Sequence, residues 1–238
     1  MNMTKTTCLL LAGFLLGCCD DGSTPTGDVE SRIGKCVEFA ANRAKSGNPV
    51  RECSLSTASA IYALSNDVRQ VECFKKWADR LLAYDTSQFG YVEREAYIRS
   101  VQTMFLTSIL GGLVWSRADP ELVFAVRLEL IGWLQDQFAQ VRPRNRRVSV
   151  GGKPDKAYLD WKWCYQSAYD CHRRAIEQLE DHDFPRETKG LPEGKRQAVK
   201  QMIEKRLGRP MRSRDEIRAS RGQDSEEYKA VMADELAP

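Results

Sequence analysis

Hydrophobic residues recur at steps of three and four along most of the chain, which is the period of an amphipathic α-helix. A clear example is residues 67–84, whose apolar positions are Val68, Val71, Phe74, Ala78, Leu81 and Leu82. Residues 97–115 are more uniformly apolar and carry no charge between Arg99 and Arg117, so we expect a buried central helix. A membrane-spanning or re-entrant role is the alternative, because the uncharged stretch reaches the lower length limit for a span. The glycine pair 111–112 would let another helix approach closely or mark a kink.

Two more helices are predicted further along the chain. Residues 119–121 (Asp-Pro-Glu) form a strong helix start, and the helix that follows should run to about Val141. Another should open near residue 155 and carry an apolar stripe at Trp161, Cys164, Ala168, Cys171, Ala175 and Leu179. Strand signals are scarce, with residues 147–150 as one short candidate. The pattern therefore predicts an all-α fold, a bundle of several helices.

Composition agrees with a folded globular protein. The 238 residues are 42% hydrophobic, 9% aromatic and 29% charged, which argues against full disorder and against a polytopic membrane protein. Lys and Arg number 36 against 33 Asp and Glu, so the net charge of +3 gives no basis for nucleic-acid binding. The chain has two histidines, His172 and His182, which leaves little material for histidine-based chemistry.

The composition changes from Pro185 onward. Of the last 54 residues 23 are charged, and Tyr228 is the only aromatic residue among them. Residues 193–221 carry a local charge of +6 and residues 224–238 a charge of −4. A modest apolar stripe remains at Ala198, Val199, Met202 and Ile203. We expect a charged, partly flexible helical extension.

A short apolar segment near the N-terminus has the layout of a signal sequence. Lys5 precedes the ten-residue apolar run Cys8–Gly17, which is too short to cross about 30 Å of hydrocarbon as a helix. The run ends in Leu15-Leu16-Gly17-Cys18, and polar residues follow. This arrangement resembles the lipobox of bacterial lipoproteins, with an apolar residue three positions before the cysteine and a small residue directly before it.

The resemblance implies that Cys18 is acylated on sulfur and becomes the first residue after cleavage, which anchors the chain to a membrane. The chain would then comprise a signal peptide (1–17), a lipidated cysteine with a flexible tether (18–31), a helical domain (32–184) and a charged extension (185–238). We expect a location in the cell envelope, facing the periplasm. Cys19 at the second mature position favours the outer membrane over the inner, and Asp20 at the third leaves the sorting open.

Disulfides are expected because the envelope is oxidising. The candidates are Cys36, Cys53, Cys73, Cys164 and Cys171, and the role of Cys19 stays open. Cys164 and Cys171 would lie ~10 Å apart along one helix, which is too far for a bridge. We therefore expect each to pair with one of the three earlier cysteines, stapling the C-terminal helix twice to the N-terminal half. Each bridge would stabilise by about 2–5 kcal/mol.

A metal site of Cys164, Cys171 and His172 is a weaker alternative, because no Cys-x-x-Cys spacing is present. We expect neither a metal nor another cofactor. Asp181-His182-Asp183 looks like an acid–base cluster, but adjacent residues on a helix point in different directions. We therefore interpret the triplet as the end of a helix before Pro185.

Four arginines in a predicted loop form the strongest charge cluster: Arg142, Arg144, Arg146 and Arg147. Guanidinium groups match phosphate, so this loop could bind lipid headgroups or another anionic partner. A solvated loop is the simpler interpretation.

Catalytic motifs are missing from the sequence: there is no Gly-x-Ser-x-Gly elbow, zinc-protease motif, phosphate-binding loop or dinucleotide fingerprint. We therefore expect a non-catalytic module that binds another envelope protein, either as an immunity or inhibitor protein or as an assembly partner of a secretion or conjugation system. One alternative is an envelope hydrolase with paired carboxylates, which predicts a deep cleft with two convergent acids. Another is a scaffold on anionic lipid, which predicts salt-sensitive vesicle binding.

Overall fold

The computed structural model describes residues 26–49, 52–141 and 169–220, and all the regular structure in these ranges is helical. The elements are α2 (Thr26–Ala44), α3 (Glu52–Tyr62), α4 (Asp67–Leu82), α5 (Tyr91–Met104), η1 (Phe105–Ile109), α6 (Leu110–Trp115), α7 (Pro120–Val141), η2 (Leu179–Asp183), α9 (Phe184–Glu187) and α10 (Glu193–Leu207). The two η elements are π-helical turns, and residues 169–178 and 214–220 are also helical. For this part of the chain the predicted all-α class is confirmed.

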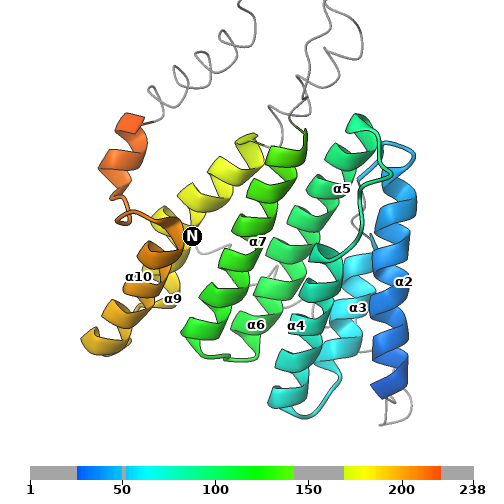
Figure 1. Ribbon diagram of the computed structural model, residues 1–238. Coiled ribbons are helices and arrows are strands. Elements are labelled where there is room, and N and C mark those ends of the chain that lie inside the picture. Colours follow the sequence, from blue (N-terminus) through cyan, green and yellow to red (C-terminus); the bar gives the residue numbers. More distant parts are fainter. Residues whose placement is uncertain (1–25, 50–51, 142–168, 221–238) are drawn as a thin grey trace, which may run out of the picture.

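Helices α2, α3 and α4, the continuous rod of α5, η1 and α6, and helix α7 alternate in direction and lie side by side (Figure 1). Helix α2 packs against α3, α4 and α5, and α7 packs against α4, α5, α6 and α10. We call the end of the bundle where α2 begins the proximal end. The α3–α4 and α6–α7 turns lie at this same end, at the bottom of Figure 1. The α4–α5 loop and the start of α5 lie at the opposite, distal end.

Helix α4 shows how the hydrophobic pattern becomes a core. The Asn66 side chain accepts hydrogen bonds from the first-turn N–H groups of the helix and caps it. Phe74, Trp77 and Leu81 are completely buried on one face. Val68 belongs to the same predicted stripe, but its side chain lies 65% exposed at the proximal end.

The predicted central helix is present as one continuous rod formed by α5, η1 and α6. Its inner face is buried, and none of the described helices is long and apolar enough to cross a membrane. The expected close approach at the glycine pair is confirmed at Gly112. A Cβ atom placed there would lie 2.2 Å from the ring of Phe74 in α4, whereas a Cβ on Gly111 would meet nothing within 4 Å.

The start and end of α7 agree with the sequence prediction. Asp119 Oδ1 accepts a hydrogen bond of 2.9 Å from the N–H of Glu121, and Pro120 occupies the first helical position. The helix ends at Val141.

The N-terminal boundary of the domain lies earlier than expected. Helix α2 begins at Thr26, so the predicted tether of residues 18–31 and domain start at residue 32 are wrong by about one and a half turns. Val29 and Ile33, four residues apart, are completely buried, and an ion pair of 2.8 Å joins Asp28 to Arg32. These i,i+4 contacts stabilise the first turns of α2, which the polar composition of this segment did not indicate.

The predicted helix end before Pro185 is also wrong. The π-turn η2 continues directly into α9, because the N–H of Phe184 bonds to the carbonyl of Leu179 five residues earlier. Pro185 then lies in the first turn of α9, where a missing N–H is tolerated. Residues 185–220 form part of the same body: Val199 and Ile203 of α10 are buried against it.

The predicted pair of disulfide staples is not seen in the described part of the chain. Cys36, Cys73 and Cys171 are not bonded to one another, which corrects the expected pairing of Cys171 with either of the other two. Cys164 lies outside the described residues, and so does the side chain of Cys53.

The surroundings of the thiols explain why Cys73 and Cys171 do not meet. Cys73 lies near the carboxylate of Glu30 in α2, whereas Cys171 lies near Glu95 and Arg99 of α5. Burial raises the pKa of both thiols, which lowers their reactivity.

Candidate functional site

Four acidic residues lie at helical spacing between residue 169 and the end of α9. Glu177, Glu180 and Asp183 are only 7%, 4% and 1% exposed, and Glu187 is half-buried. Their spacing of three, three and four residues is typical of one helix face. Buried carboxylates are costly unless they are paired, so their partners decide what this face can do.

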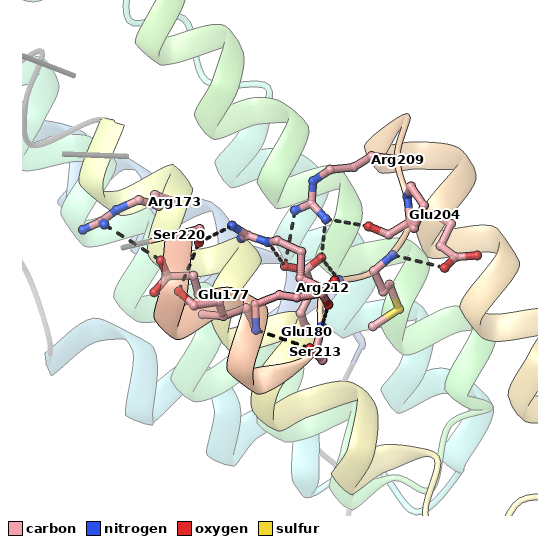
Figure 2. Close-up of polar contacts among 12 residues, drawn as sticks. Arg173, Glu177, Glu180, Glu204, Arg209, Arg212, Ser213 and Ser220 are labelled. Atoms are coloured by element: carbon pink, nitrogen blue, oxygen red, sulfur yellow. Dashed lines mark hydrogen bonds and ion pairs between the residues drawn. The ribbon is translucent and has the colours of Figure 1, made fainter. Parts of the chain in front are cut away.

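Glu180 is paired with two arginines from the chain that follows α10. Its carboxylate accepts hydrogen bonds from Arg209 Nη1 at 2.6 Å, from Arg212 Nε at 3.0 Å and from the Arg212 backbone N–H at 3.0 Å. Figure 2 shows both guanidinium groups pointing at this one side chain. The Glu180 side chain is completely buried by these contacts.

The sequence after α10 brings these arginines back over Glu180. Helix α10 ends at Gly208, whose φ of 68° is a left-handed conformation that glycine adopts readily. The N–H of Met211 then bonds to Glu204 Oε1 at 3.1 Å. Ser213 and Glu216 exchange side-chain and backbone hydrogen bonds, a capping box that starts the helix 214–220.

Asp183 forms an ion pair with Arg127 of α7, and both side chains are almost completely buried. Arg186 reaches the same carboxylate at 3.2 Å from its exposed side. Burial lowers the pKa of Arg127 to about 10, so the guanidinium stays charged at neutral pH. This pair fastens η2 to the middle of α7.

An open groove with a volume of about 780 Å³ lies beside these ion pairs. Its floor contains Glu180, Asp181, Phe184 and Pro185. One wall is α10, with Glu193, Arg196, Gln197 and Lys200, and the other is the segment with Met211, Arg212, Ser213, Arg214 and Glu216.

The charges lining the groove are largely compensated within the protein. Arg214 Nε lies 2.6 Å from Asp181, and this hydrogen bond lowers the pKa of the Asp181 carboxyl. The Ser213 N–H lowers the pKa of Glu216 in the same way. Arg196 stacks over the ring of Phe184 at 5.8 Å, so its guanidinium faces an aromatic ring instead of a carboxylate.

Two carboxylates of the groove are held in the ionised form. The hydrogen bonds to Asp181 and Glu216 lower the pKa of each carboxyl, so both side chains carry a negative charge at neutral pH. The described residues hold no cluster of three His, Cys, Asp or Glu side chains that could bind a metal ion.

As the spacing predicted, the side chains of Asp181, His182 and Asp183 do not converge on one point. Asp183 turns inward to Arg127, whereas Asp181 pairs with Arg214 at the groove. His182 is 62% exposed and lies 3.3 Å from Asp181.

None of the site residues predicted from the sequence that the structure describes lines the groove. Cys36 is buried in α2, Cys73 is half-buried in α4, and Cys171 is half-buried in the helix 169–178. Cys18 and the arginines at positions 142, 144, 146 and 147 lie outside the described residues.

The buried ion pairs were not predicted, although the sequence carries two signals for them. Arg127 interrupts the apolar run 122–128 of α7, and a charge in such a run needs a buried partner. The acidic positions 177, 180, 183 and 187 follow a helical period. Neither signal identifies the partner residues, because Arg209 and Arg212 are distant from Glu180 in the sequence and approach it only in the folded chain.

Comparisons with protein-family models, with curated proteins and with solved structures find no match to this chain.

Proposed function

We propose that this chain is a lipid-anchored protein of the cell envelope that binds another protein through the groove beside α10, without catalysis. The observation that carries the proposal is the groove itself: it is large and open, and its buried carboxylates are neutralised by arginines. A partner would therefore meet a preformed surface.

The lining of the groove indicates the chemistry of the partner. Arg196, Gln197 and Lys200 offer hydrogen-bond donors along one wall, while Phe184 and Met211 add apolar contacts. Side chains of both charges and apolar residues occur together in protein–protein interfaces, where arginine and methionine are enriched. A protein segment with carboxylate and apolar side chains fits this surface. An inhibited effector or a component of a secretion or conjugation system would belong to this class.

The anchor is inferred from the lipobox resemblance at Cys18. The anchor would place the chain in the cell envelope, which is an oxidising compartment. One experiment tests this part: the non-reduced protein is extracted from membranes, its free thiols are alkylated, and its intact mass is measured. We expect a chain that begins at acylated Cys18. A full-length chain starting at Met1 would overturn the anchor and the envelope location.

The binding function is tested by photo-crosslinking in intact cells. A photoreactive residue replaces Gln197 on the groove wall or, as the matched control, the exposed Gln88 of the α4–α5 loop. We expect a defined protein adduct from position 197 and none from position 88. Adding Arg196→Glu and Lys200→Glu should abolish the adduct. Equal adducts from both glutamines, or none from either, would contradict the proposal.

The competing functions give different results. A hydrolase with paired carboxylates would lose activity on envelope polymers when Glu180 is replaced by Gln. A scaffold on anionic lipid would lose vesicle binding as salt is raised.

A further inference from the structure

Four of the large hydrophobic side chains that remain exposed gather at the proximal end of the bundle. Trp115 is 80% exposed at the last residue of α6, and Val114 beside it is 37% exposed. Val68 in the first turn of α4 is 65% exposed, and Tyr62 at the last residue of α3 is 42% exposed. Tryptophan is usually well buried, so Trp115 requires an explanation.

The chain enters the fold at this same end. Helix α2 begins at Thr26 at the proximal end (Figure 1), and seven residues, 19–25, separate it from Cys18. Seven residues span at most about 25 Å when fully extended. If Cys18 is anchored as proposed above, the proximal end is therefore the part of the body nearest the membrane.

The turn after Trp115 has a strained backbone. The N–H of Ala118 bonds to the carbonyl of Leu113 and the N–H of Arg117 to that of Val114, a helix ending that normally has glycine in the left-handed position. Arg117 occupies that position with φ 56°. Strained residues concentrate at functional sites, and Arg117 follows the exposed Trp115 by two residues.

We infer that the proximal end of the bundle is a membrane-docking surface, on which Trp115 enters the headgroup region of the bilayer. Indole rings favour that depth, where their apolar body is buried and their N–H stays hydrated. This inference rests on the proposed anchor and adds an orientation: the bundle stands with α6 pointing at the lipid, and the groove remains open to a partner.

The charges at the proximal end predict what drives the docking. Arg69 and Arg117 lie there with Asp67, Asp119 and Glu121. Lys195 of α10 reaches the same end, 3.8 Å from Asp119, so the positive and negative charges balance. Docking should therefore depend on apolar burial and change little with salt or with the proportion of anionic lipid.

Fluorescence quenching by lipid tests the orientation. The full anchored chain is reconstituted into phosphatidylcholine vesicles with or without brominated acyl chains, which quench nearby tryptophans. The other four tryptophans, Trp77, Trp133, Trp161 and Trp163, are common to the wild type and the variant, so Trp115→Phe isolates the contribution of the docking residue. We expect the brominated lipid to quench the wild type more than Trp115→Phe, at low and at high salt.

Two variants on the Trp115→Phe background move the tryptophan. Val68→Trp restores it at the proximal end, and quenching should return. Tyr91→Trp places it at the distal start of α5, roughly 36 Å away along the rod, and should not restore quenching. Quenching that is equal in wild type and Trp115→Phe, or that follows Tyr91→Trp, would overturn the inference.

Flotation of the vesicles separates this inference from the proposed anchor. Protein that floats but shows no quenching of Trp115 retains the anchor and overturns the orientation. Protein that does not float overturns the anchor, and the orientation fails with it.

Discussion

The largest completely buried side chains, among them Trp77, Tyr97 and Phe74, all belong to helices α2 to α7. In residues 169–220, by contrast, buried positions also hold Glu177, Glu180 and Asp183, each facing arginine. The first region is held together mainly by apolar volume, with one buried carboxylate, Glu95, paired to Arg99 within α5. The second region adds several buried carboxylates matched by arginine to its apolar contacts.

Because of this difference, the two regions should tolerate different kinds of substitution. A packed apolar core resists changes in volume, because it has few voids and its side chains cannot relax freely. A buried ion pair resists the loss of one partner, because the remaining charge is left without compensation in a poorly hydrated site. Such pairs fix the position of a segment more than they add stability, which suits a region whose groove we propose as a binding site.

The largest effect is expected where the two regions meet, at the pair between Asp183 and Arg127. Asp183→Asn leaves the Arg127 guanidinium buried and uncompensated, and should lower the free energy of unfolding by about 3–5 kcal/mol. Urea denaturation measures the change. Arg186→Gln removes the exposed partner of the same carboxylate and should cost less than about 1 kcal/mol. Similar losses of unfolding free energy in both variants would mean that burial does not increase the contribution of the Asp183–Arg127 pair.

Replacing both members of the pair sharpens the comparison. Arg127→Met combined with Asp183→Leu removes both charges and should recover most of the stability that Asp183→Asn loses. A double variant as unstable as the single one would show that the pair itself stabilises the fold.

The apolar region should respond to a single added methyl group. Gly112→Ala would place a Cβ within 2.6 Å of three ring atoms of the buried Phe74, and should destabilise by about 1–3 kcal/mol in thermal or urea denaturation. Gly111→Ala is the matched control, because its Cβ meets nothing within 4 Å and alanine favours a helix. If both glycines tolerate alanine equally, the core is less tightly packed than the geometry indicates.

A smaller and opposite effect is expected at the left-handed residue Arg117. Arg117→Gly relieves its backbone strain and should raise the free energy of unfolding by about 1 kcal/mol, which a shift in Tm would report. Arg117→Ala keeps the strain and removes the guanidinium, so it should leave Tm unchanged. A loss of stability in the alanine variant would assign the guanidinium a structural contact.

The smallest effect is a pH dependence between pH 7.5 and 5.5. Burial lowers the pKa of His172 below its ordinary value of 6.5, so the unfolded chain takes up a proton there before the folded protein does. This contribution to stability is complete above pH 6.5 and is lost as the pH falls through the lowered pKa. His172 lines a cavity of about 330 Å³ together with the charged side chains of Asp136, Arg206 and Arg209.

Two variants assign this dependence. His172→Asn should flatten the fall in Tm between pH 7.5 and 5.5, whereas His182→Asn should keep it, because His182 is largely exposed. A slope that disappears with His182 instead would contradict the assignment.

The helices could be predicted from the sequence where a cap and an apolar stripe coincide. The start of α7 at Pro120 and its end at Val141 were predicted, as was the contact at Gly112. The start of α2 was missed because Gly27 and polar neighbours conceal the apolar pair Val29 and Ile33. Local composition cannot show that a distant helix will cover such a pair.

The groove could not be predicted in the same way. The arginines that pair with its η2 carboxylates come from the segment 209–214, and only the turn at Gly208 brings the two together. Pro185 was expected to end the helix, because the rule that a proline ends a helix assumes α-helical hydrogen bonds. In the π-turn before Pro185, the carbonyl of Leu179 instead accepts a hydrogen bond from the N–H five residues later.

The π-turn η1 also sets the phase of the helix that follows it. A π-turn contains one residue more than an α-turn of the same height, so η1 acts as a one-residue insertion in the rod from Tyr91 to Trp115. Deleting one residue from Phe105–Ile109 would rotate α6 by about 100° relative to α5. Gly112 would then turn away from Phe74, and Trp115 would move to another side of the proximal end. The length of this segment, and not only its composition, is therefore under structural constraint.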